Sequence, residues 1–293
     1  MGPLTCFERT TIKMKTKKTL FVLSITSDIG IHIAKHYWEK GYEIFGTYRN
    51  RTSLDFMNKA LPDAHFYHCD AQDSASIDKA ALEIAQKISK WDIFVSCPCT
   101  PIPLSRFQSS DIDEWEKSFY LNSIGQLRFL HRLIPYRAHP TESMQPLVLF
   151  LAGGGTNNAV DAFSAYTSAK IHLIKMFELL AFEDQTTKYC IIGPGWTNTK
   201  THYVTLENTD KNSNKYKEVS EFLRNPSNGT PLEDIASCIE WIDKQDPRLV
   251  SGRNFSVVHD QWRGQHTDQL LKTLGENHDM YKLRRSGNHI NFK

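Results

Sequence analysis

Short apolar runs alternate with segments of helical periodicity along most of the chain. Each apolar run has the length and continuity of a strand buried on both faces. Strands are therefore predicted at residues 19–25, 43–48, 64–69, 91–96, 147–151, 188–193 and 254–259. Helical spacing predicts helices at residues 29–40, 51–60, 74–90, 112–133, 164–183, 216–223 and 232–244. This alternation predicts an α/β fold in which a parallel sheet is covered by helices on both faces.

Polar segments flank and interrupt this pattern without splitting the predicted core. Residues 136–145 and 200–214 are polar and are predicted to be loops. Residues 1–18 carry four lysines and no apolar core for a signal peptide, so they are interpreted as a flexible leader. Residues 261–293 are polar and are interpreted as a C-terminal tail. A single domain is therefore predicted over residues 19–260.

Composition and charge narrow the class of protein. With 40% hydrophobic and 23% charged residues among 293, the chain has an ordinary globular composition. A formal net charge of +2 provides no long-range field, so neither nucleic acid nor a membrane surface is an expected partner. No apolar run approaches the roughly 18 residues that span a bilayer. The six scattered cysteines lack zinc-site spacing, which favours free thiols, no metal site and a cytoplasmic protein.

The stretch AGGGTNNAVDAFSAYTSAK at residues 152–170 is the first candidate for chemistry. Tyr166 and Lys170 are four residues apart in a predicted helix, so they share one face. An ammonium beside a phenol is expected to lower the phenol pKa from about 10 toward neutral, which suits proton transfer. The alternative is an exposed helix face, because this spacing arises on the order of once by chance in a chain with 11 tyrosines.

Several further motifs occur in a characteristic order around this pair. SDIG follows the first predicted strand, GTYR the second and CDA the third, and PGWTNT follows the sixth. Together with Asn122 in a long helix and the YxxxK pair, they resemble the short-chain dehydrogenase/reductase family over about residues 19–260. The resemblance implies a Rossmann-type doubly wound parallel sheet of about seven strands. It also implies a homodimer or homotetramer formed through the long helices.

The resemblance implies a nicotinamide dinucleotide at the ends of the strands. The implied cofactor-binding residues are Ser24, Thr26, Ser27, Asp28, Ile29, Gly30, Arg49, Asp70, Ala71, Ser96, Cys97, Pro98, Lys170, Pro194, Gly195, Thr197 and Thr199. Arg49 follows the second strand where users of NAD carry a carboxylate, which favours NADP over NAD. The alternatives are that Arg49 and the nearby Arg51 cap a surface loop and that Asp70 caps a helix.

The chain departs from the family pattern at three places. Ser24 and Asp28 replace two of the three glycines of the first loop, and only Gly30 is kept. The segment SCPC at residues 96–99 stands where the family has NNAG. Gly153 occupies the place of the catalytic serine, and Thr156 is the candidate to replace its hydroxyl.

The function implied is an NADP-dependent carbonyl reductase or alcohol dehydrogenase. Tyr166 would act as general acid or base, Lys170 would tune it and hold the ribose, Asn122 would anchor a proton relay, and Thr156 would polarise the oxygen. Residues 200–230 would form a substrate lid, and a small sugar or nucleotide-sugar compound is the suggested substrate. The alternatives are a cofactor-binding sensor or partner subunit with little turnover and, by fold analogy alone, a fatty-acid ketoreductase.

Overall fold

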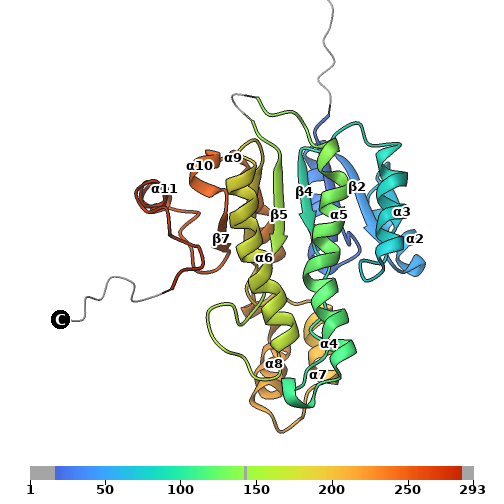
Figure 1. The fold of residues 1–293 in the computed structure, drawn as a ribbon, viewed down its shortest axis with the longest axis vertical. Coiled ribbons are helices and arrows are strands. Elements are labelled where there is room, and N and C mark those ends of the chain that lie inside the picture. Colours follow the sequence, from blue (N-terminus) through green and yellow to red (C-terminus); the bar gives the residue numbers. More distant parts are fainter. Residues whose placement is uncertain (1–16, 142–143, 286–293) are drawn as a thin grey trace, which may run out of the picture.

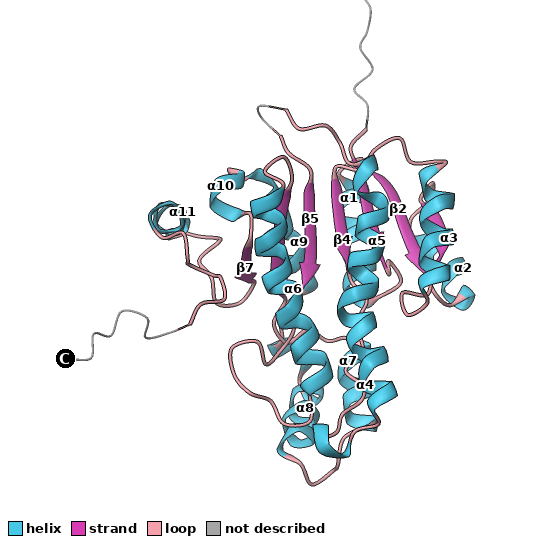
Figure 2. Ribbon diagram, in the orientation of Figure 1, coloured by secondary structure: helices cyan, strands magenta, loops and turns pink. Residues whose placement is uncertain are grey.

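A computed structural model describes residues 17–141 and 144–285 of the chain as a sheet between two layers of helices (Figures 1 and 2). The sheet has seven parallel strands in the order β3-β2-β1-β4-β5-β6-β7. The strands are β1 (Thr19–Leu23), β2 (Glu43–Tyr48), β3 (His65–His68), β4 (Ile93–Ser96), β5 (Leu147–Leu151), β6 (Lys188–Gly193) and β7 (Arg253–Ser256). The predicted fold class is thus confirmed, with the order reversing between β1 and β4 at a topological switch point.

Two hydrophobic clusters, one on each face, join the helices to the sheet. The principal helices are α1 (Asp28–Glu39), α2 (Leu54–Ala60), α3 (Ser74–Ala85), α4 (Ile112–Phe119), α5 (Gly125–Leu133), α6 (Ser164–Glu183), α7 (Lys200–Glu207), α8 (Asn214–Arg224), α9 (Leu232–Lys244), α10 (Pro247–Val250) and α11 (Thr267–Glu276). One cluster packs α1, α2, α9 and α11 on the sheet, and the other packs α3, α5 and α6. Alternate β1 residues divide between the clusters, with Leu20 and Val22 in the first and Phe21 and Leu23 in the second.

The predicted elements match the observed ones best where the sequence pattern is unbroken. Strands β2, β5 and β6 and helices α6 and α9 have the predicted bounds. The single helix predicted at residues 112–133 is instead α4, a π-helical segment (Tyr120–Ile124) and α5 in succession. A π-helical segment admits an extra residue into a turn and leaves little trace in the hydrophobic spacing.

Two polar regions contain helices that the sequence pattern did not predict. The predicted loop at residues 200–214 is wrong in its first half, where α7 forms and buries Thr205. Residues 261–285 include α11, which places Leu270 and Leu274 in the core although most of its positions are polar. Both helices are short, so packing against the rest of the fold stabilises them more than intrinsic helix propensity does. The leader predicted at residues 1–18 lies outside the described residues except for its last two.

Among the helices of residues 17–141 and 144–285, none combines the length and the apolar character that a membrane crossing requires. The same residues bring together no group of three or more histidine, cysteine, aspartate or glutamate side chains suited to a metal ion.

Candidate active site

A large cleft lies along the carboxyl ends of the strands. Its volume is about 1240 Å³, and its walls are the segments that follow β1 to β6, the helices α7 and α8, and residues 281–283 near the C-terminus. In Figure 1 the strands point toward α7 and α8, which lie beyond the sheet. The carboxyl ends of parallel strands at a switch point are where open α/β sheets bind their ligands, so this cleft is the candidate site.

Tyr166 and Lys170 lie in this cleft, one turn apart on α6. The Lys170 side chain is buried, and its Nζ donates a hydrogen bond of 3.0 Å to the Leu151 carbonyl at the end of β5. The same Nζ lies 5.8 Å from the centroid of the Tyr166 ring. The structure therefore brings the predicted pair together and fixes the lysine to the sheet.

The predicted lowering of the Tyr166 pKa is wrong. Burial raises the pKa of Tyr166 well above its ordinary value, and the neighbouring Cys99 raises it further through charge and a hydrogen bond. Burial likewise lowers the pKa of Lys170, which Cys99 and Cys97 partly oppose. Spacing along the helix revealed the neighbouring charge but not the loss of solvent, which disfavours the charged form of both groups.

Asn122 sits in the π-helical segment and is fully buried, outside the lining of the cleft. Its Oδ1 accepts a hydrogen bond of 3.1 Å from the Thr100 N–H, and its Nδ2 donates one of 2.8 Å to the Thr100 carbonyl. The Nδ2 also donates to the Ser118 carbonyl one turn earlier. Asn122 thus fixes the loop after β4, which carries Cys99 beside Tyr166.

Gly153 and Thr156 belong to the loop between β5 and α6. A Cβ atom added at Gly153 would lie 2.1 Å from the Tyr166 Oη, so the phenol occupies the space of a side chain at this position. Thr156 lines the cleft, but no hydrogen bond joins its hydroxyl to Tyr166 in the part of the chain that the structure describes. The role predicted for Thr156 is therefore not supported by a contact with Tyr166 among the described residues.

The loop after β1 has a backbone conformation typical of glycine at Ser24, although serine stands there in place of the family's glycine. Ser24 has φ of 61°, in the left-handed region that favours glycine. Its N–H donates a hydrogen bond of 2.9 Å to the Thr47 Oγ1, and Ser27 caps α1 by accepting one of 3.0 Å from the Gly30 N–H. A Cβ at Gly30 would lie 2.7 Å from the Ser24 carbonyl oxygen, so α1 packs directly against the loop. The N-terminus of α1 lines the cleft, as a pyrophosphate site requires.

Asp28, the first residue of α1, is directed to another helix. Its carboxylate accepts a hydrogen bond of 2.8 Å from the Lys200 N–H at the start of α7, and the Lys200 Nζ lies 3.8 Å away. Asp28 therefore joins the first loop to α7, while the capping of α1 falls to Ser27. Thr26 and Ile29 line the cleft beside it.

The other predicted cofactor residues fall into two groups. Those that line the cleft are Arg49, Asp70, Ala71, Cys97, Pro98, Pro194, Gly195, Thr197 and Thr199. Those packed behind it are Gly30 and Ser96, and Ser96 donates a hydrogen bond of 2.8 Å to the Gln126 Oε1. The suggestion that Asp70 caps a helix is wrong, because Asp73 caps α3 and Asp70 accepts from the Gln72 N–H.

Several features of the cleft fit a nicotinamide dinucleotide. Its volume and its position at the switch point suit a long ligand, and the N-terminus of α1 lines it through Ser27, Asp28 and Ile29. Arg49 is exposed at the end of β2, where the cleft carries no carboxylate. The Thr197 hydroxyl is buried in the cleft wall without a hydrogen-bond partner among the described residues, as expected of a group whose partner is a ligand.

An aromatic and cationic cluster at the α7 side of the cleft was not predicted. The Trp196 ring stacks on His202 with centroids 5.2 Å apart and meets Phe222 of α8 at the same distance. The Lys215 Nζ lies 4.7 Å from the Trp196 centroid and 5.6 Å from that of Phe163, which precedes α6. The sequence does not show which aromatic rings Lys215 meets, because three separate segments bring them together.

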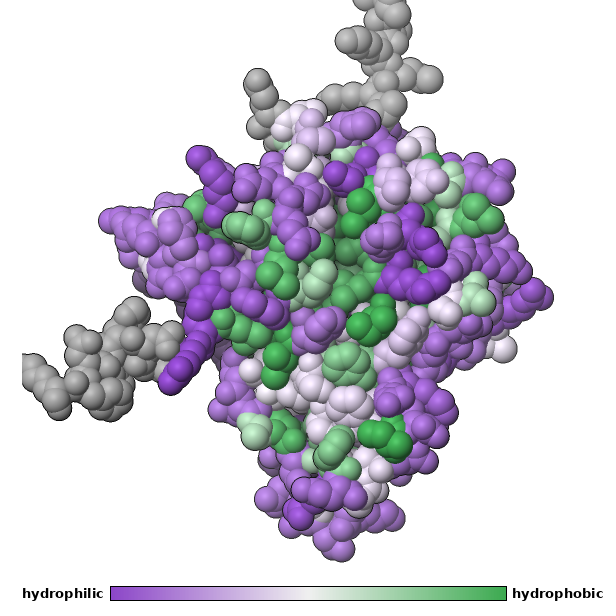
Figure 3. Space-filling view, in the orientation of Figure 1, coloured by the Kyte–Doolittle hydropathy of each residue, from purple (hydrophilic) through white to green (hydrophobic). Residues whose placement is uncertain are grey.

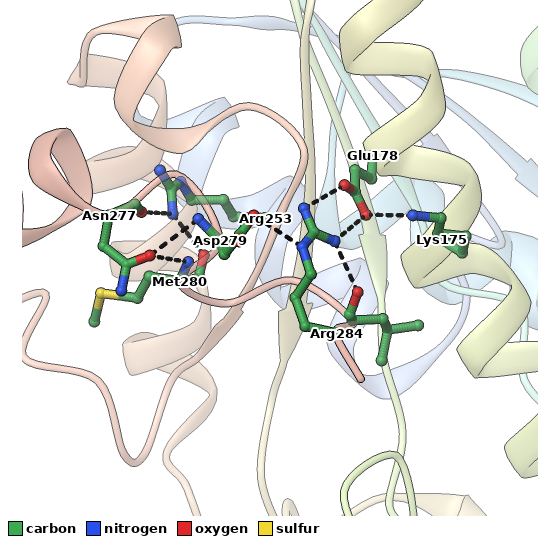
Figure 4. Close-up of polar contacts among 8 residues, drawn as sticks. Lys175, Glu178, Arg253, Asn277, Asp279, Met280 and Arg284 are labelled. Carbon is green, nitrogen blue, oxygen red and sulfur yellow. Dashed lines mark hydrogen bonds and ion pairs between the residues drawn. The ribbon is translucent and has the colours of Figure 1, made fainter. Parts of the chain in front are cut away.

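The segment before residue 286 reaches the cleft through a second unpredicted set of contacts (Figure 4). The Arg253 guanidinium, which is 3% exposed, donates hydrogen bonds to the carbonyls of Leu274, Asn277 and Met280. Arg284 binds Glu178 on α6, where its Nη2 lies 2.7 Å from the carboxylate, and also Asp279. Residues 281–283 between these anchors line the cleft.

Comparisons with known proteins agree with this geometry. A family model described as Enoyl-(Acyl carrier protein) reductase matches residues 25–258. Serine 3-dehydrogenase of Rhizobium radiobacter is 23% identical over 79% of this chain and 90% of its own length. The 3-oxoacyl-(acyl-carrier-protein) reductase FabG of Buchnera aphidicola is 24% identical over 82% of this chain and 96% of its own length.

Solved structures share the fold. The short chain dehydrogenase/reductase YIR035C of Saccharomyces cerevisiae has a TM-score of 0.74 at 17% identity, covering 84% of this chain and 98% of that one. A short chain dehydrogenase of Shigella flexneri, complexed with NADP, has a TM-score of 0.67 at 17% identity, covering 82% and 97%.

The doubly wound sheet, the switch-point cleft and the family match identify a dinucleotide-dependent oxidoreductase. The chain belongs to the short-chain dehydrogenase/reductase family, whose members oxidise CH–OH groups or reduce carbonyls with NAD or NADP.

Proposed function

We propose that this protein is an NADP(H)-dependent carbonyl reductase or alcohol dehydrogenase in which Tyr166 transfers the proton. The observation that carries the proposal is that Tyr166 and Lys170, one turn apart on α6, line the same cleft as the N-terminus of α1. The raised pKa of Tyr166 keeps the phenol protonated near pH 7, which suits donation to a substrate oxygen.

Other residues of the chain would bind the successive parts of the cofactor. Ser24 to Gly30 would hold the pyrophosphate at the N-terminus of α1, and Arg49 would pair with the 2′-phosphate of NADP, as a guanidinium does bidentately. Lys170, held by the Leu151 carbonyl, would hold the nicotinamide ribose. NADPH, when bound, would supply the hydride for the carbonyl carbon.

We further propose that α7 and α8 act as a substrate lid. Lys215 contacts both Trp196 and Phe163, so it spans from α8 to the start of the helix that carries Tyr166. Aromatic rings and a cation at this side of the cleft favour a polar carbonyl compound of the sugar or nucleotide-sugar kind. The five free cysteines among the described residues suit a reducing compartment such as the cytoplasm.

We propose a homodimer or homotetramer formed through α4, α5 and α6. Exposed apolar side chains on these helices and on the π-helical segment between α4 and α5 include Ile112, Ile124, Leu179 and Phe182, and Phe182 is 81% exposed. Figure 3 shows apolar residues gathered along the middle of the view, where Figure 1 places α5 and α6. Such a patch on a helical face is typical of a protein–protein interface. Analytical ultracentrifugation of the whole chain measures this association directly.

A second candidate is a cofactor-binding protein with little turnover, acting as a sensor or partner subunit. It is favoured by Gly153, which offers no hydroxyl beside Tyr166. Losing one donor to the developing oxyanion costs on the order of 10²- to 10³-fold in rate.

One experiment separates the two candidates. NADPH binding is followed by fluorescence, and NADPH consumption is then measured with a panel of sugar-derived and simple ketones. For the reductase, Tyr166→Phe should lower the turnover rate at least 10²-fold and leave NADPH affinity unchanged, because it removes only the proton donor. Tyr67→Phe is the matched control, since Tyr67 lies on β3 outside the cleft. Binding without turnover across the panel would favour the second candidate.

A further inference from the structure

Lys215 is the cation that α8 contributes to the cleft. Its Nζ lies 4.7 Å from the centroid of the Trp196 ring and 5.6 Å from that of Phe163. The Phe163 ring in turn lies 6.2 Å from the Tyr166 ring, centroid to centroid. One aromatic ring is thus the common neighbour of the ammonium and of the phenol that would transfer the proton.

The aromatic rings hold the Lys215 side chain at the cleft but leave its charge available. The side chain is 27% exposed, whereas Lys217, two residues later, is exposed and lies outside the cleft lining. Contact with aromatic rings fixes an ammonium without neutralising it. The Lys215 Nζ lies 3.4 Å from the Glu218 Oε2, and the Glu218 side chain is 58% exposed. An ion pair so open to water is weak, so the ammonium can bind another anion.

The cleft lining around Lys215 has no carboxylate among the described residues. The acidic residues that line the cleft are Asp28, Asp70 and Asp260. Asp28 is bound to Lys200, while the other two lie after β3 and after β7. His202 is the titratable group beside Lys215, and burial and the lysine charge both lower the pKa of its imidazole. A negatively charged group that entered this side of the cleft would therefore be attracted by Lys215 and repelled by no nearby lining residue.

We propose that Lys215 binds an anionic group, a carboxylate or a phosphate, on the substrate whose carbonyl meets Tyr166. The inference rests on the proposed function and deepens it, because it narrows the substrate to a carbonyl compound with negative charge away from the carbonyl. An ammonium presents three N–H donors as a compact charge, so it accepts either group. Among sugar compounds, a sugar acid, a sugar phosphate and a nucleotide sugar carry such a group, and a neutral sugar does not.

Matched substrates separate the effect of charge from that of the rest of the molecule. With saturating NADPH, linear oxo acids of increasing length are compared with their methyl esters, and ketose phosphates with the free ketoses. In at least one pair, the charged member should have a KM at least about 10-fold lower, because a hydrogen bond between charged groups is the stronger kind. The preferred pair shows whether the group is a carboxylate or a phosphate. Equal KM values within every pair would overturn the inference.

Variants of α8 then assign the effect to one residue. Lys215→Met removes the charge and keeps the apolar stem, so it should raise KM at least about 10-fold for the charged substrate and leave kcat unchanged. For the neutral partner, KM should stay within about 3-fold. Glu218→Gln removes the competing carboxylate and should lower KM for the charged substrate about 2- to 5-fold. Lys217→Met is the matched control, which changes the net charge equally outside the cleft lining and should leave every KM unchanged.

A purely structural role for Lys215 predicts a different result. If the lysine only packs α8 against Trp196 and Phe163, Lys215→Met should change the KM of charged and neutral substrates by the same factor. That outcome would overturn the inference, while the dependence of turnover on Tyr166 would leave the proposed function standing.

Binding of the anion is also measured without turnover. With NADP present to fill the cofactor site, quenching of tryptophan fluorescence by the same oxo acids and sugar phosphates is recorded for the parent and for Lys215→Met. Each protein is compared with its Trp196→Phe counterpart, so that the difference reports Trp196. If the parent binds NADPH but reduces no substrate, the proposed function fails. A midpoint at least about 10-fold higher in Lys215→Met would still support the role of Lys215, and equal midpoints would refute it.

Discussion

The two ends of the cleft are held together by different kinds of contact. The β1–β3 end is formed by the loops after those strands. Its side chains differ from the family pattern, but local contacts hold the backbone in the conformation that the glycines of that pattern would adopt. Ser24 stays left-handed, and Gly30 packs against it six residues later. The other end comprises α7, α8, β7 and residues 274–285, and we call it the α7–α8 end. There, segments far apart in sequence are joined by side chains such as Lys215 and Arg253.

This difference shows which part of a site tolerates substitution. Close backbone packing leaves one acceptable path, so a loop built on it keeps its shape when serine replaces glycine. Contacts between long side chains depend on the identity of both partners and can be rearranged, which is how a cleft changes its substrate while keeping its cofactor. Three substitutions test this contrast, in order of decreasing effect.

The largest effect is expected from Arg253→Met at the α7–α8 end. The guanidinium satisfies three carbonyls in a buried place, and charged hydrogen bonds there contribute about 1.5–3 kcal/mol each at most. Since methionine retains the apolar part of the side chain, we expect a net loss of about 3 kcal/mol in the free energy of unfolding. Urea denaturation measures this loss.

Arg248→Met is the control for this substitution. Arg248 is a surface arginine paired with Asp246, and its removal should leave the denaturation midpoint unchanged. Equal midpoints for the Arg253 and Arg248 variants would contradict the view that side-chain contacts hold this end of the molecule.

Gly30→Ala should have the next largest effect, at the β1–β3 end. The added Cβ would lie 2.7 Å from the Ser24 carbonyl oxygen and 2.7 Å from the Ser27 Oγ. Such overpacking costs about 1–3 kcal/mol, and the loop must move away from α1. We therefore expect about 2 kcal/mol of destabilisation and at least about 10-fold weaker NADPH binding by fluorescence titration.

Gly275→Ala provides the matched control for Gly30→Ala. Gly275 lies in α11, and the nearest atom to an added Cβ is the Leu249 Cδ2 at 3.5 Å, an ordinary contact. Because alanine favours helix over glycine by up to about 1 kcal/mol, this variant should be more stable than the parent. A Gly30→Ala protein that gains stability in the same way would break the comparison.

The sequence predicted the backbone of this molecule better than its site. Strands such as β5 and β6 are unbroken apolar runs, and their bounds follow from the sequence alone. The tyrosine and lysine of α6 were predicted to meet because four residues make one helical turn. The Tyr166 pKa was predicted in the wrong direction, since a one-dimensional pattern shows charge neighbours but not how far solvent is excluded.

The side-chain contacts at the α7–α8 end were not predicted, for a related reason. Lys215, Trp196 and Phe163 meet only after three separate segments have folded, and no local spacing records that meeting. The carbonyl partners of Arg253 follow it by more than 20 residues. They lie in the segment that the sequence predicts to be a polar tail. Long-range side-chain contacts of this kind determine the site but leave local hydrophobic periodicity unchanged.

Ser24→Gly should have the smallest effect and gives the sharpest test of the contrast. Ser24 occupies φ of 61°, which costs an L-residue about 1–2 kcal/mol, while glycine loses about 0.5–1 kcal/mol of chain entropy on folding. The net result should be a gain in stability of less than about 1 kcal/mol. In the loop, the Ser24 N–H donates to the Thr47 Oγ1 and the Ser24 carbonyl accepts from the Ser27 N–H, and glycine retains both backbone groups. NADPH affinity should therefore stay within about 3-fold, which is under 1 kcal/mol.

Ala162→Gly, at φ of 64° in the loop after β5, should show the same small gain. If Ser24→Gly instead weakened NADPH binding 10-fold while Ala162→Gly did not, the serine side chain would be part of the binding chemistry, and this end would depend on side-chain identity as the other does.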